Sequence, residues 1–272
     1  MDGMRNRSRG AFSRWALPCA ALAAASAASA ADAGSFRAGI GYDYTSGSYG
    51  GPQTITETYV PVSGAYRLDQ FELRVTVPYV SVSGPATIID DATGEFAPGP
   101  GGTHSGLGDV ILGATLYDVL RSESAQFSLD VAGKLKFGTA SASKGLGTGE
   151  TDYSLQVDAL KEIGDFGLFG TAGYVVRGSP GVLKLRDVPF GAVGGDLRVS
   201  DAARAGLSYS YRPSAIEGYQ AVQQAALFVI FAPGNSFTIR PYVSAGFGDS
   251  SPSWGAGIAL SWKFDTRGFT AW

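Results

Sequence analysis

Apolar and polar residues alternate along most of this chain, and this alternation constrains the fold more than any other feature of the sequence. Between Phe127 and Phe137 every second residue is apolar or glycine, and the intervening positions carry two lysines and an aspartate. A period of two residues is typical of a half-buried β-strand, whereas an amphipathic helix repeats about every 3.6 residues. No segment shows a convincing helical period, so the sequence predicts an all-β protein.

The same alternation, with varying clarity, predicts twelve strands of about ten residues, a length that suits tilted strands crossing a membrane. Strands of soluble β-sandwiches are usually shorter, about five or six residues. In 187–199 the alternation slips at Gly194-Gly195, as it would at a β-bulge, and the run from Ala225 to Phe231 is apolar on both faces. We expect strands at 36–44, 57–67, 70–81, 107–118, 125–137, 151–162, 165–177, 187–199, 202–212, 219–231, 236–247 and 253–264.

The connections between these segments alternate in length. Long ones at 45–56, 82–106 and 138–150 are separated by turns as short as Leu68-Asp69 and Ile163-Gly164. Barrels of the outer membrane have short turns at one end and longer loops at the other. An even strand number also places both termini at the short-turn end. The sequence therefore predicts a transmembrane antiparallel up-and-down β-barrel of about twelve strands.

Aromatic residues gather near both ends of the predicted strands. Membrane barrels carry aromatic girdles at their two interfaces, whereas the general preference of aromatic residues for strands does not predict two rims. We expect one rim of Tyr44, Tyr79, Phe137, Tyr153, Tyr211, Tyr219, Phe247 and Trp254 near the long loops, and one of Phe36, Phe71, Phe127, Phe166, Phe231, Phe237, Trp262 and Phe264 near the short turns.

Charged residues recur on the strand face opposite the apolar one, which in a membrane barrel is the lumen face. They could line a pore and set its electrostatic preference, or pair across neighbouring strands and fill a narrow interior. Pairing could join Glu72 and Arg74 with Asp109, or Asp130 and Lys134 with Asp158. The candidate lumen-lining residues are Arg37, Glu72, Arg74, Asp109, Asp130, Lys134, Lys136, Asp158, Arg177, Arg204, Arg212 and Arg240.

The N-terminus has the pattern of a secretory signal peptide. Four arginines precede or open a short apolar stretch, and Ala28-Ser29-Ala30 is a small-residue cleavage site. We expect a signal peptide at 1–30 and a barrel domain at 31–272. The only cysteine, Cys19, lies in the predicted signal peptide, so the mature chain would have no thiol chemistry. The formal net charge of the whole chain is −3, and losing the arginines makes the remainder more acidic, which argues against nucleic acid as a partner.

Two stretches resemble a known family. Gly106-Leu107-Gly108-Asp109-Val110 is similar to a GxGD element of the outer-membrane proteins grouped under the MetA pathway of phenol degradation, a transporter-like barrel family. A strand ending in Phe137-Gly138-Thr139, followed by a glycine-rich loop at 145–149, resembles that family's next block, although the family has Pro-Thr-Gly at the strand end. The likeness is sharpest over 106–177. It implies an outer-membrane location and passage of small, often aromatic or apolar, compounds, and it supplies no catalytic residues.

The last predicted strand carries a second likeness. Its Gly257, Leu260, Trp262 and Phe264 are spaced like the signal by which the barrel-assembly machinery recognises a final strand, although Asp265 to Trp272 follow. The partners expected for the chain are therefore outer-membrane lipid, a small-molecule solute and, during biogenesis, the barrel-assembly machinery.

Residues for catalysis or cofactor binding have little support in the sequence. His104 is the only histidine, and a lipase-like use of His104-Ser105 is disfavoured because the two are adjacent in a glycine-rich loop. Asp90-Asp91 with Glu95 lacks the spacing of a calcium loop, so we expect solvated loop acids there. Gly145-x-Gly147-x-Gly149 has no lysine or following helix to bind phosphate. The sequence predicts neither an enzyme nor a cofactor.

Two functional hypotheses follow. The first is an outer-membrane channel or passive transporter for small molecules, supported by the polar strand face and the family resemblance. The alternative is a closed structural or adhesive barrel that acts through its extracellular loops, of which the Gly/Pro-rich stretch from Phe96 to His104 is the most distinctive.

Overall fold

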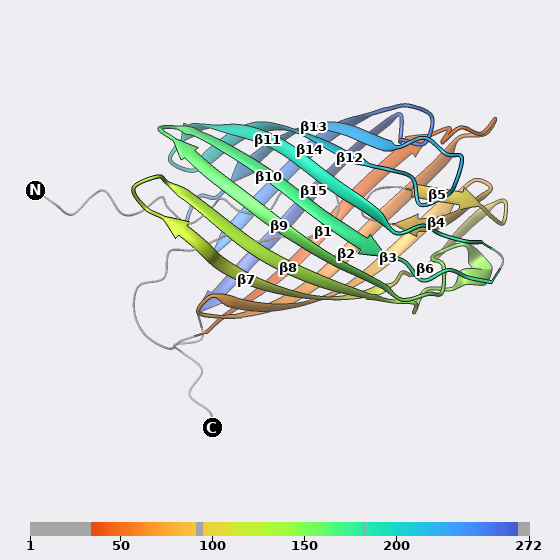
Figure 1. Cartoon of the computed structure of the whole chain (residues 1–272), viewed down its shortest axis with the longest axis horizontal. Helices are drawn as coiled ribbons and strands as arrows, with labels where there is room; N and C mark the ends of the chain where they lie inside the picture. Colours follow the sequence, from red (N-terminus) through yellow and green to blue (C-terminus); the bar gives the residue numbers. More distant parts are fainter. Residues whose placement is uncertain (1–33, 91–94, 182, 266–272) are drawn as a thin grey trace, which may run out of the picture.

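A computed structural model describes residues 34–90, 95–181 and 183–265, which form an antiparallel β-barrel (Figure 1). Within these residues, thirteen strands occupy twelve positions, because β6 and β7 follow one another along β3. The barrel strands are β1 (Ser35–Gly47), β2 (Ile55–Leu68), β3 (Phe71–Ser83), β6 (Thr103–Leu107), β7 (Val110–Ser122), β8 (Phe127–Phe137), β9 (Asp152–Ile163), β10 (Phe166–Val176), β11 (Val188–Ser200), β12 (Ala203–Arg212), β13 (Val222–Phe231), β14 (Phe237–Phe247) and β15 (Trp254–Asp265).

The first and last strands close the sheet into a ring. β1 pairs with β15 from Ser35 opposite Asp265 to Ser46 opposite Trp254, and every other barrel strand pairs with its neighbours in the chain. Closure leaves no strand edge in the wall, as the hydrocarbon region of a membrane demands. Both ends of the described barrel lie at the short-turn end, on the left of Figure 1, as the even strand count predicts. The predicted twelve-stranded barrel is thus confirmed.

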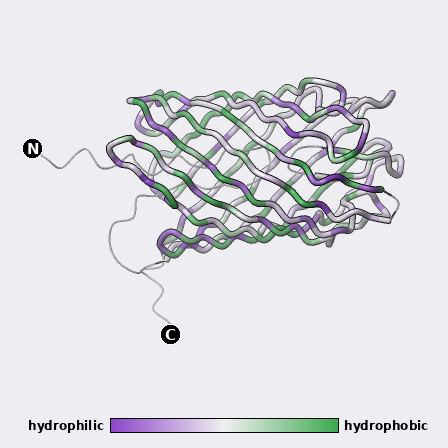
Figure 2. Tube along the Cα trace, in the orientation of Figure 1, coloured by the Kyte–Doolittle hydropathy of each residue, from purple (hydrophilic) through white to green (hydrophobic). Residues whose placement is uncertain are grey.

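The outside of the barrel is apolar and the inside is polar. Val193 and Leu227 are 62% and 60% exposed on the outer face, whereas Asp196 and Gln224, on the inner face of the same strands, are buried. Figure 2 shows the resulting alternation of hydropathy along each strand. A soluble β-sandwich would bury its apolar face, so this inverted polarity excludes it and fits a barrel in lipid. Among the described residues no helix is long and apolar enough to cross a membrane.

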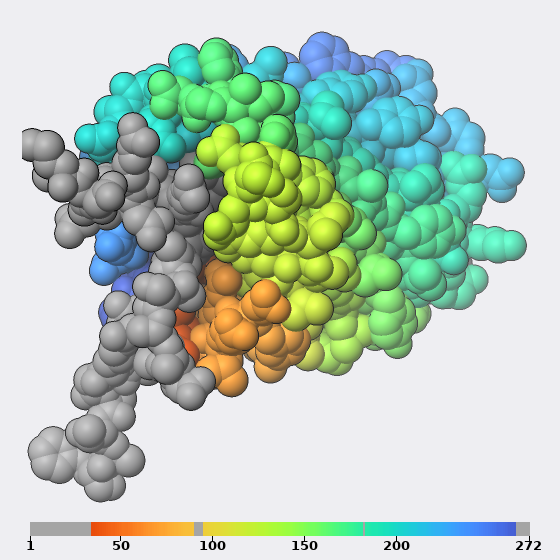
Figure 3. All heavy atoms as spheres, turned by 60° about the vertical axis from the view of Figure 1, so that its left-hand side comes forward, coloured from red at the N-terminus to blue at the C-terminus, as the bar shows by residue number. Residues whose placement is uncertain are grey.

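The two predicted aromatic rims lie largely on the outer face. At the seam between β1 and β15, Phe36 and Phe264 lie 6.2 Å apart, centroid to centroid, near the short turns, and Tyr44 and Trp254 lie 5.3 Å apart near the long loops. Figure 3, in which the short-turn end comes forward, shows the β2–β3 turn (orange) beside the β7–β8 turn (yellow-green). The backbone of β7 is joined to the β2–β3 turn, since Tyr117 N–H donates to the Gln70 carbonyl at 2.7 Å.

The two ambiguous strands are regular at the positions where their alternation is unclear. The predicted bulge at Gly194-Gly195 is wrong, because β11 keeps one register against β10 from Val188 to Leu197. The irregularity lies instead between Arg198 and Ser200. Two successive glycines resemble a slip in the apolar–polar alternation, because glycine has no side chain to show which face of the strand it occupies. In β13 the alternation is also continuous, and Phe228 and Ile230 are buried on the inner face.

The fourth strand position differs from the prediction of one strand at 107–118. It is divided into β6 and β7 around Gly108-Asp109, and β7 runs on to Ser122 with a register irregularity between Leu116 and Leu120. The Asp118 backbone between them has a φ of 51°, the left-handed conformation that accommodates the irregularity.

A charged residue introduced on the outer face should destabilise the barrel more when it lies deeper in the bilayer. Val193→Arg, at the middle of β11, should lower the free energy of unfolding in phospholipid vesicles by about 2–4 kcal/mol, because arginine must be taken into hydrocarbon. Val199→Arg, on the same face at the end of the strand, is the matched control and should cost about 0–1 kcal/mol. Equal costs in chemical unfolding experiments would contradict the assignment of this face to lipid.

Candidate functional site: the lumen and its closed mouth

The predicted loop at 82–106 is not an unstructured outer loop. It contains a hairpin of β4 (Ala86–Asp90) and β5 (Glu95–Pro98), which pair in a small separate sheet and then lead into β6. The hairpin lies at the long-loop end of the barrel, on the right of Figure 1. Alternation did not reveal it, because each strand is only four or five residues long.

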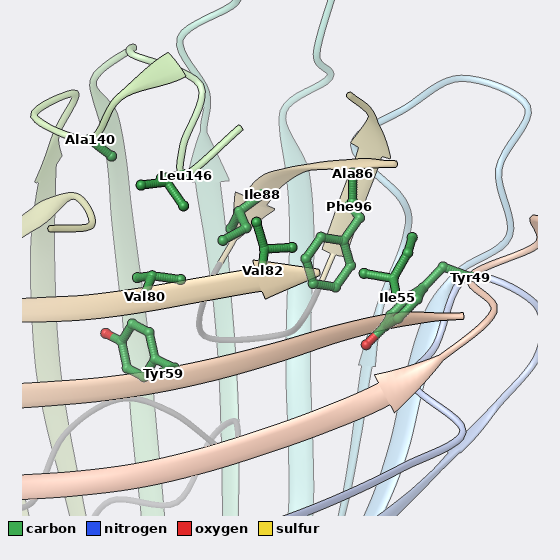
Figure 4. Close-up of a cluster of buried hydrophobic side chains, with 10 residues drawn as sticks. All are labelled: Tyr49, Ile55, Tyr59, Val80, Val82, Ala86, Ile88, Phe96, Ala140 and Leu146. Carbon is green, nitrogen blue, oxygen red and sulfur yellow. The ribbon is translucent and has the colours of Figure 1, made fainter. Parts of the chain in front are cut away.

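One side of the hairpin packs against the inner wall. Ile88 and Phe96, which are opposite each other in the hairpin, lie over Val82 of β3 and Ile55 of β2 (Figure 4). The ring of Tyr49 meets Phe96 edge-on with centroids 4.6 Å apart. The whole buried cluster comprises Tyr49, Ile55, Tyr59, Val80, Val82, Ala86, Ile88, Phe96, Ala140 and Leu146.

A second apolar cluster attaches the hairpin to the far side of the barrel. Ile89 and Ala97 are buried against Leu185, in the β10–β11 loop, and against Ala215 and Ile216, in the β12–β13 loop. In the twelve-position ring β2 and β3 lie across from the β10–β12 region. The hairpin therefore bridges opposite sides of the barrel and covers its mouth.

A chain of alternating charges encloses the same end of the lumen. Its members come from the β6–β7 junction, β8, β9, the end of β10 and β12 in the wall, and from β5 in the hairpin. We call it the charge belt: Asp109–Lys136 (2.8 Å), Lys136–Asp152 (3.3 Å), Asp152–Arg177 (3.2 Å), Arg177–Glu95 (4.0 Å) and Glu95–Arg212 (2.7 Å). Three acids and three bases balance, as buried charges require.

Glu95 lies in a different environment from the one that its sequence context predicts. It is only 2% exposed and is not the solvated acid that was expected. Its carboxylate accepts hydrogen bonds from Arg212 Nη2 (2.7 Å), Ser214 Oγ (2.8 Å) and the Ala215 N–H (2.7 Å). Asp91, its proposed companion, lies outside the described residues, and no His/Cys/Asp/Glu group suited to a metal occurs among the residues described. No local signal marks a partner that is over a hundred residues away.

The predicted lumen residues are all buried or half-buried, and several pair differently from the expectation. Glu72 binds Arg37 (3.3 Å) and Arg74 (2.7 Å) near the short turns. Asp109 does not join Glu72 and Arg74, because it lies toward the long-loop end, where Lys136 is its partner. Three of the predicted residues, Lys136, Arg177 and Arg212, are in the charge belt with Asp109.

The remaining predicted residues lie along the inner wall. Asp130 is directly opposite Asp158 in the β8–β9 register, and Asp158 accepts hydrogen bonds from Gln156 and Thr171. Arg204 forms an ion pair with Asp196 of β11. Lys134 of β8 is opposite Ser154, and Arg240 of β14 is opposite Ala259. Asp196 was not among the predicted residues, although the alternation along β11, which places it on the inner face, could have suggested it.

Aromatic rings lying on glycines form a different surface of the lumen. Phe169 of β10 is directly opposite Gly194, and Phe228 of β13 is directly opposite Gly206. A Cβ on either glycine would come within 2.5 Å of the facing ring. Because both intervening strands carry glycine here, the rings lean toward each other and their centroids lie 6.1 Å apart.

The same arrangement recurs on one further strand pair and a second time between β10 and β11. Tyr242 of β14 lies over Gly257 of β15, and its hydroxyl donates to Asp43 of β1 at 2.7 Å. Phe190 of β11 lies over Gly173 of β10. Sequence reasoning missed this aromatic wall, because a direct aromatic–glycine pair can be recognised only once the register between the strands is known.

His104 and Ser105 do not form a catalytic pair. They are consecutive residues of β6, so their side chains point to opposite faces of the strand. The ring Nε2 of His104 lies 3.0 Å from the Gly101 carbonyl oxygen.

The fold of this chain resembles those of solved outer-membrane proteins. No family model and no curated protein matches the chain. Among solved structures, an outer membrane channel from Pseudomonas putida F1 superimposes with a TM-score of 0.67, covering 87% of this chain and 97% of that chain at 14% identity. This chain has the fold of an outer-membrane channel. The KdgM porin in complex with disordered oligogalacturonate gives a TM-score of 0.51 at 10% identity, covering 85% of this chain and 99% of that chain. The fold that the sequence resemblance implied is confirmed.

The aromatic wall should depend on its glycines. In Gly206→Ala the new Cβ would lie 2.4 Å from Phe228 Cζ and 2.6 Å from the Gly195 carbonyl oxygen, so ring and backbone must both shift. We expect the free energy of unfolding to fall by about 1–3 kcal/mol. Gly170→Ala is the control, because its Cβ would meet nothing closer than 3.7 Å. Equal stability of the two variants in urea titrations would show that the rings do not need the glycine surface.

Proposed function

We propose that this protein is a passive channel for small molecules in the bacterial outer membrane. The observation that carries the proposal is a closed barrel with an apolar outer face and a charged inner face. The fold shared with outer-membrane channels supports the same function.

The lumen has a charged wall around β1 and β3 and, across the ring, a wall where aromatic rings accompany the Asp196–Arg204 ion pair, and this indicates what passes through it. Arg37, Glu72 and Arg74 lie on β1 and β3, whereas Phe169 and Phe228 lie on β10 and β13, across the ring. A solute with an apolar or aromatic body and a polar end can contact both walls at once. We infer small compounds of this kind as the solutes, in agreement with those implied by the family resemblance.

The assembly partners and the absence of catalysis are further parts of the proposal. Trp262 and Phe264 of β15 are exposed on the outer face, where the barrel-assembly machinery would meet a final strand. The expected N-terminal signal peptide lies outside the described residues. The separation of His104 and Ser105 removes the one catalytic arrangement considered, and the protein is proposed to act as a channel and not as an enzyme.

The alternative of a closed structural or adhesive barrel also has an observation in its favour, namely the hairpin that covers the mouth. The two functions differ in what happens when the hairpin is removed. Replacing residues 86–98 with a short Gly/Ser linker should increase permeability if the barrel is a channel. Unchanged permeability together with loss of binding to a partner would favour adhesion.

Liposome swelling tests the channel directly. Protein in which the Gly/Ser linker replaces residues 86–98 should let vesicles swell in small sugars, and adding Phe169→Ala/Phe228→Ala should raise the swelling rate severalfold, because two rings are removed from the lumen. Adding Phe166→Ala/Phe231→Ala removes two rings from the outer face and is the matched control, with no expected change in rate. Folded protein that gives no swelling above empty vesicles, with the hairpin present or replaced and in both ring variants, would reject the channel.

A further inference from the structure

The groups around Glu95 form a complete receptor for a carboxylate. Arg212 contributes a guanidinium, Ser214 a hydroxyl and Ala215 a backbone N–H, all within 2.8 Å of a Glu95 oxygen. A second guanidinium, that of Arg177, lies 4.0 Å away. Both arginine side chains are almost completely buried. Charge-assisted hydrogen bonds of this kind are the strongest that proteins make with a carboxylate.

Groups outside the hairpin help to hold the receptor in place, although Arg177 Nη1 also donates to the Ile89 carbonyl oxygen of the hairpin at 3.3 Å. Arg186 Nη2 donates to the carbonyl oxygens of Ser214 (2.8 Å) and Ile216 (3.3 Å), which orders the β12–β13 loop. Asp152 of β9 fixes Arg177 at 3.2 Å. Glu95 therefore enters a site whose donors come from the barrel and from the loops opposite.

An apolar surface adjoins the receptor. Leu185, Ala215 and Ile216 are buried beneath Ile89 and Ala97 of the hairpin. When the hairpin leaves, this surface would need a new apolar cover. The receptor and its surroundings thus match a carboxylate attached to an apolar body.

We propose that Glu95 occupies the binding site of a solute carboxylate, and that such a solute opens the mouth by taking its place. A small organic acid with an apolar body satisfies Arg212, Ser214 and Ala215 as Glu95 does, and it covers the apolar surface that Ala97 leaves. The hairpin then loses its strongest polar attachment and moves away from the mouth. This proposal rests on the channel function for its purpose, but the binding site can be tested without any measurement of transport.

Cysteine accessibility reports the position of the hairpin. Ala97 is 4% exposed. In a Cys19→Ser background, Ala97→Cys should react slowly with a water-soluble thiol reagent, and Ser124→Cys, in an exposed turn at the other end, is the reactive reference. Adding benzoate should raise the rate at position 97 in a concentration-dependent way, whereas its neutral analogue benzamide should not. Adding Glu95→Ala should raise the rate about tenfold or more without benzoate, because the buried ion pair is gone.

Calorimetry in detergent tests the receptor itself. Benzoate should bind the Glu95→Ala variant more tightly than the wild type, since the internal competitor is absent, and Arg212→Gln should abolish binding. Glu95→Gln, which keeps the side-chain shape, is the second variant if the alanine protein folds poorly, and it should also release the hairpin. Glu217→Gln, an exposed acid in the same loop, is the control and should behave as wild type.

Each outcome decides a part of the proposal. Slow reaction at position 97 in both Glu95 variants would overturn the attachment of the hairpin by Glu95. Fast reaction in these variants without benzoate binding would overturn the carboxylate receptor. Failure of the channel function would appear separately, as absence of swelling even with benzoate present or the hairpin replaced, in a protein whose cysteine reactivity and benzoate binding behave as expected.

Discussion

Backbone hydrogen bonding in lipid is the constraint from which the rest of this structure follows. Hydrocarbon offers no partner to an unpaired N–H or C=O group, so strands that cross it must close into a ring. Here the β1–β15 pairing completes that ring, and the other strands follow in chain order. Closure then assigns the two faces of every strand, with the apolar one to lipid and the polar one to the lumen.

The polar inner face imposes a second constraint, because its charged side chains must be buried in a narrow interior. The structure pairs them around Glu72 near the short turns, between Arg204 and Asp196, and in the charge belt at the long-loop end. Within the belt, Glu95 of the hairpin is the acid that pairs with Arg212, and it also lies 4.0 Å from Arg177. The same ion pairs of Glu95 therefore balance charge in the wall and hold the hairpin over the mouth. Breaking one partner of such a pair leaves a buried charge without compensation.

Sequence reasoning recovered the features that depend on periodicity. Strand number, loop asymmetry, the aromatic rims and the inward direction of residues such as Arg37 and Arg204 follow from a period of two. It failed where information comes from register or from distant contacts. Gly194-Gly195 suggested a bulge because glycine has no side chain to show its face, and the place of Gly194 beneath Phe169 requires the β10–β11 register. Glu95 looked like a solvated acid because its hydrogen-bond partners Arg212, Ser214 and Ala215 follow more than a hundred residues later.

The lumen of this barrel is proposed to conduct small solutes, and planar-bilayer recording of the purified, folded protein measures this conduction. We expect discrete conductance steps from single barrels, with larger or more frequent openings when the hairpin over the mouth is replaced by a short linker. Inserted barrels that show no conductance, with the hairpin present or removed, would contradict it.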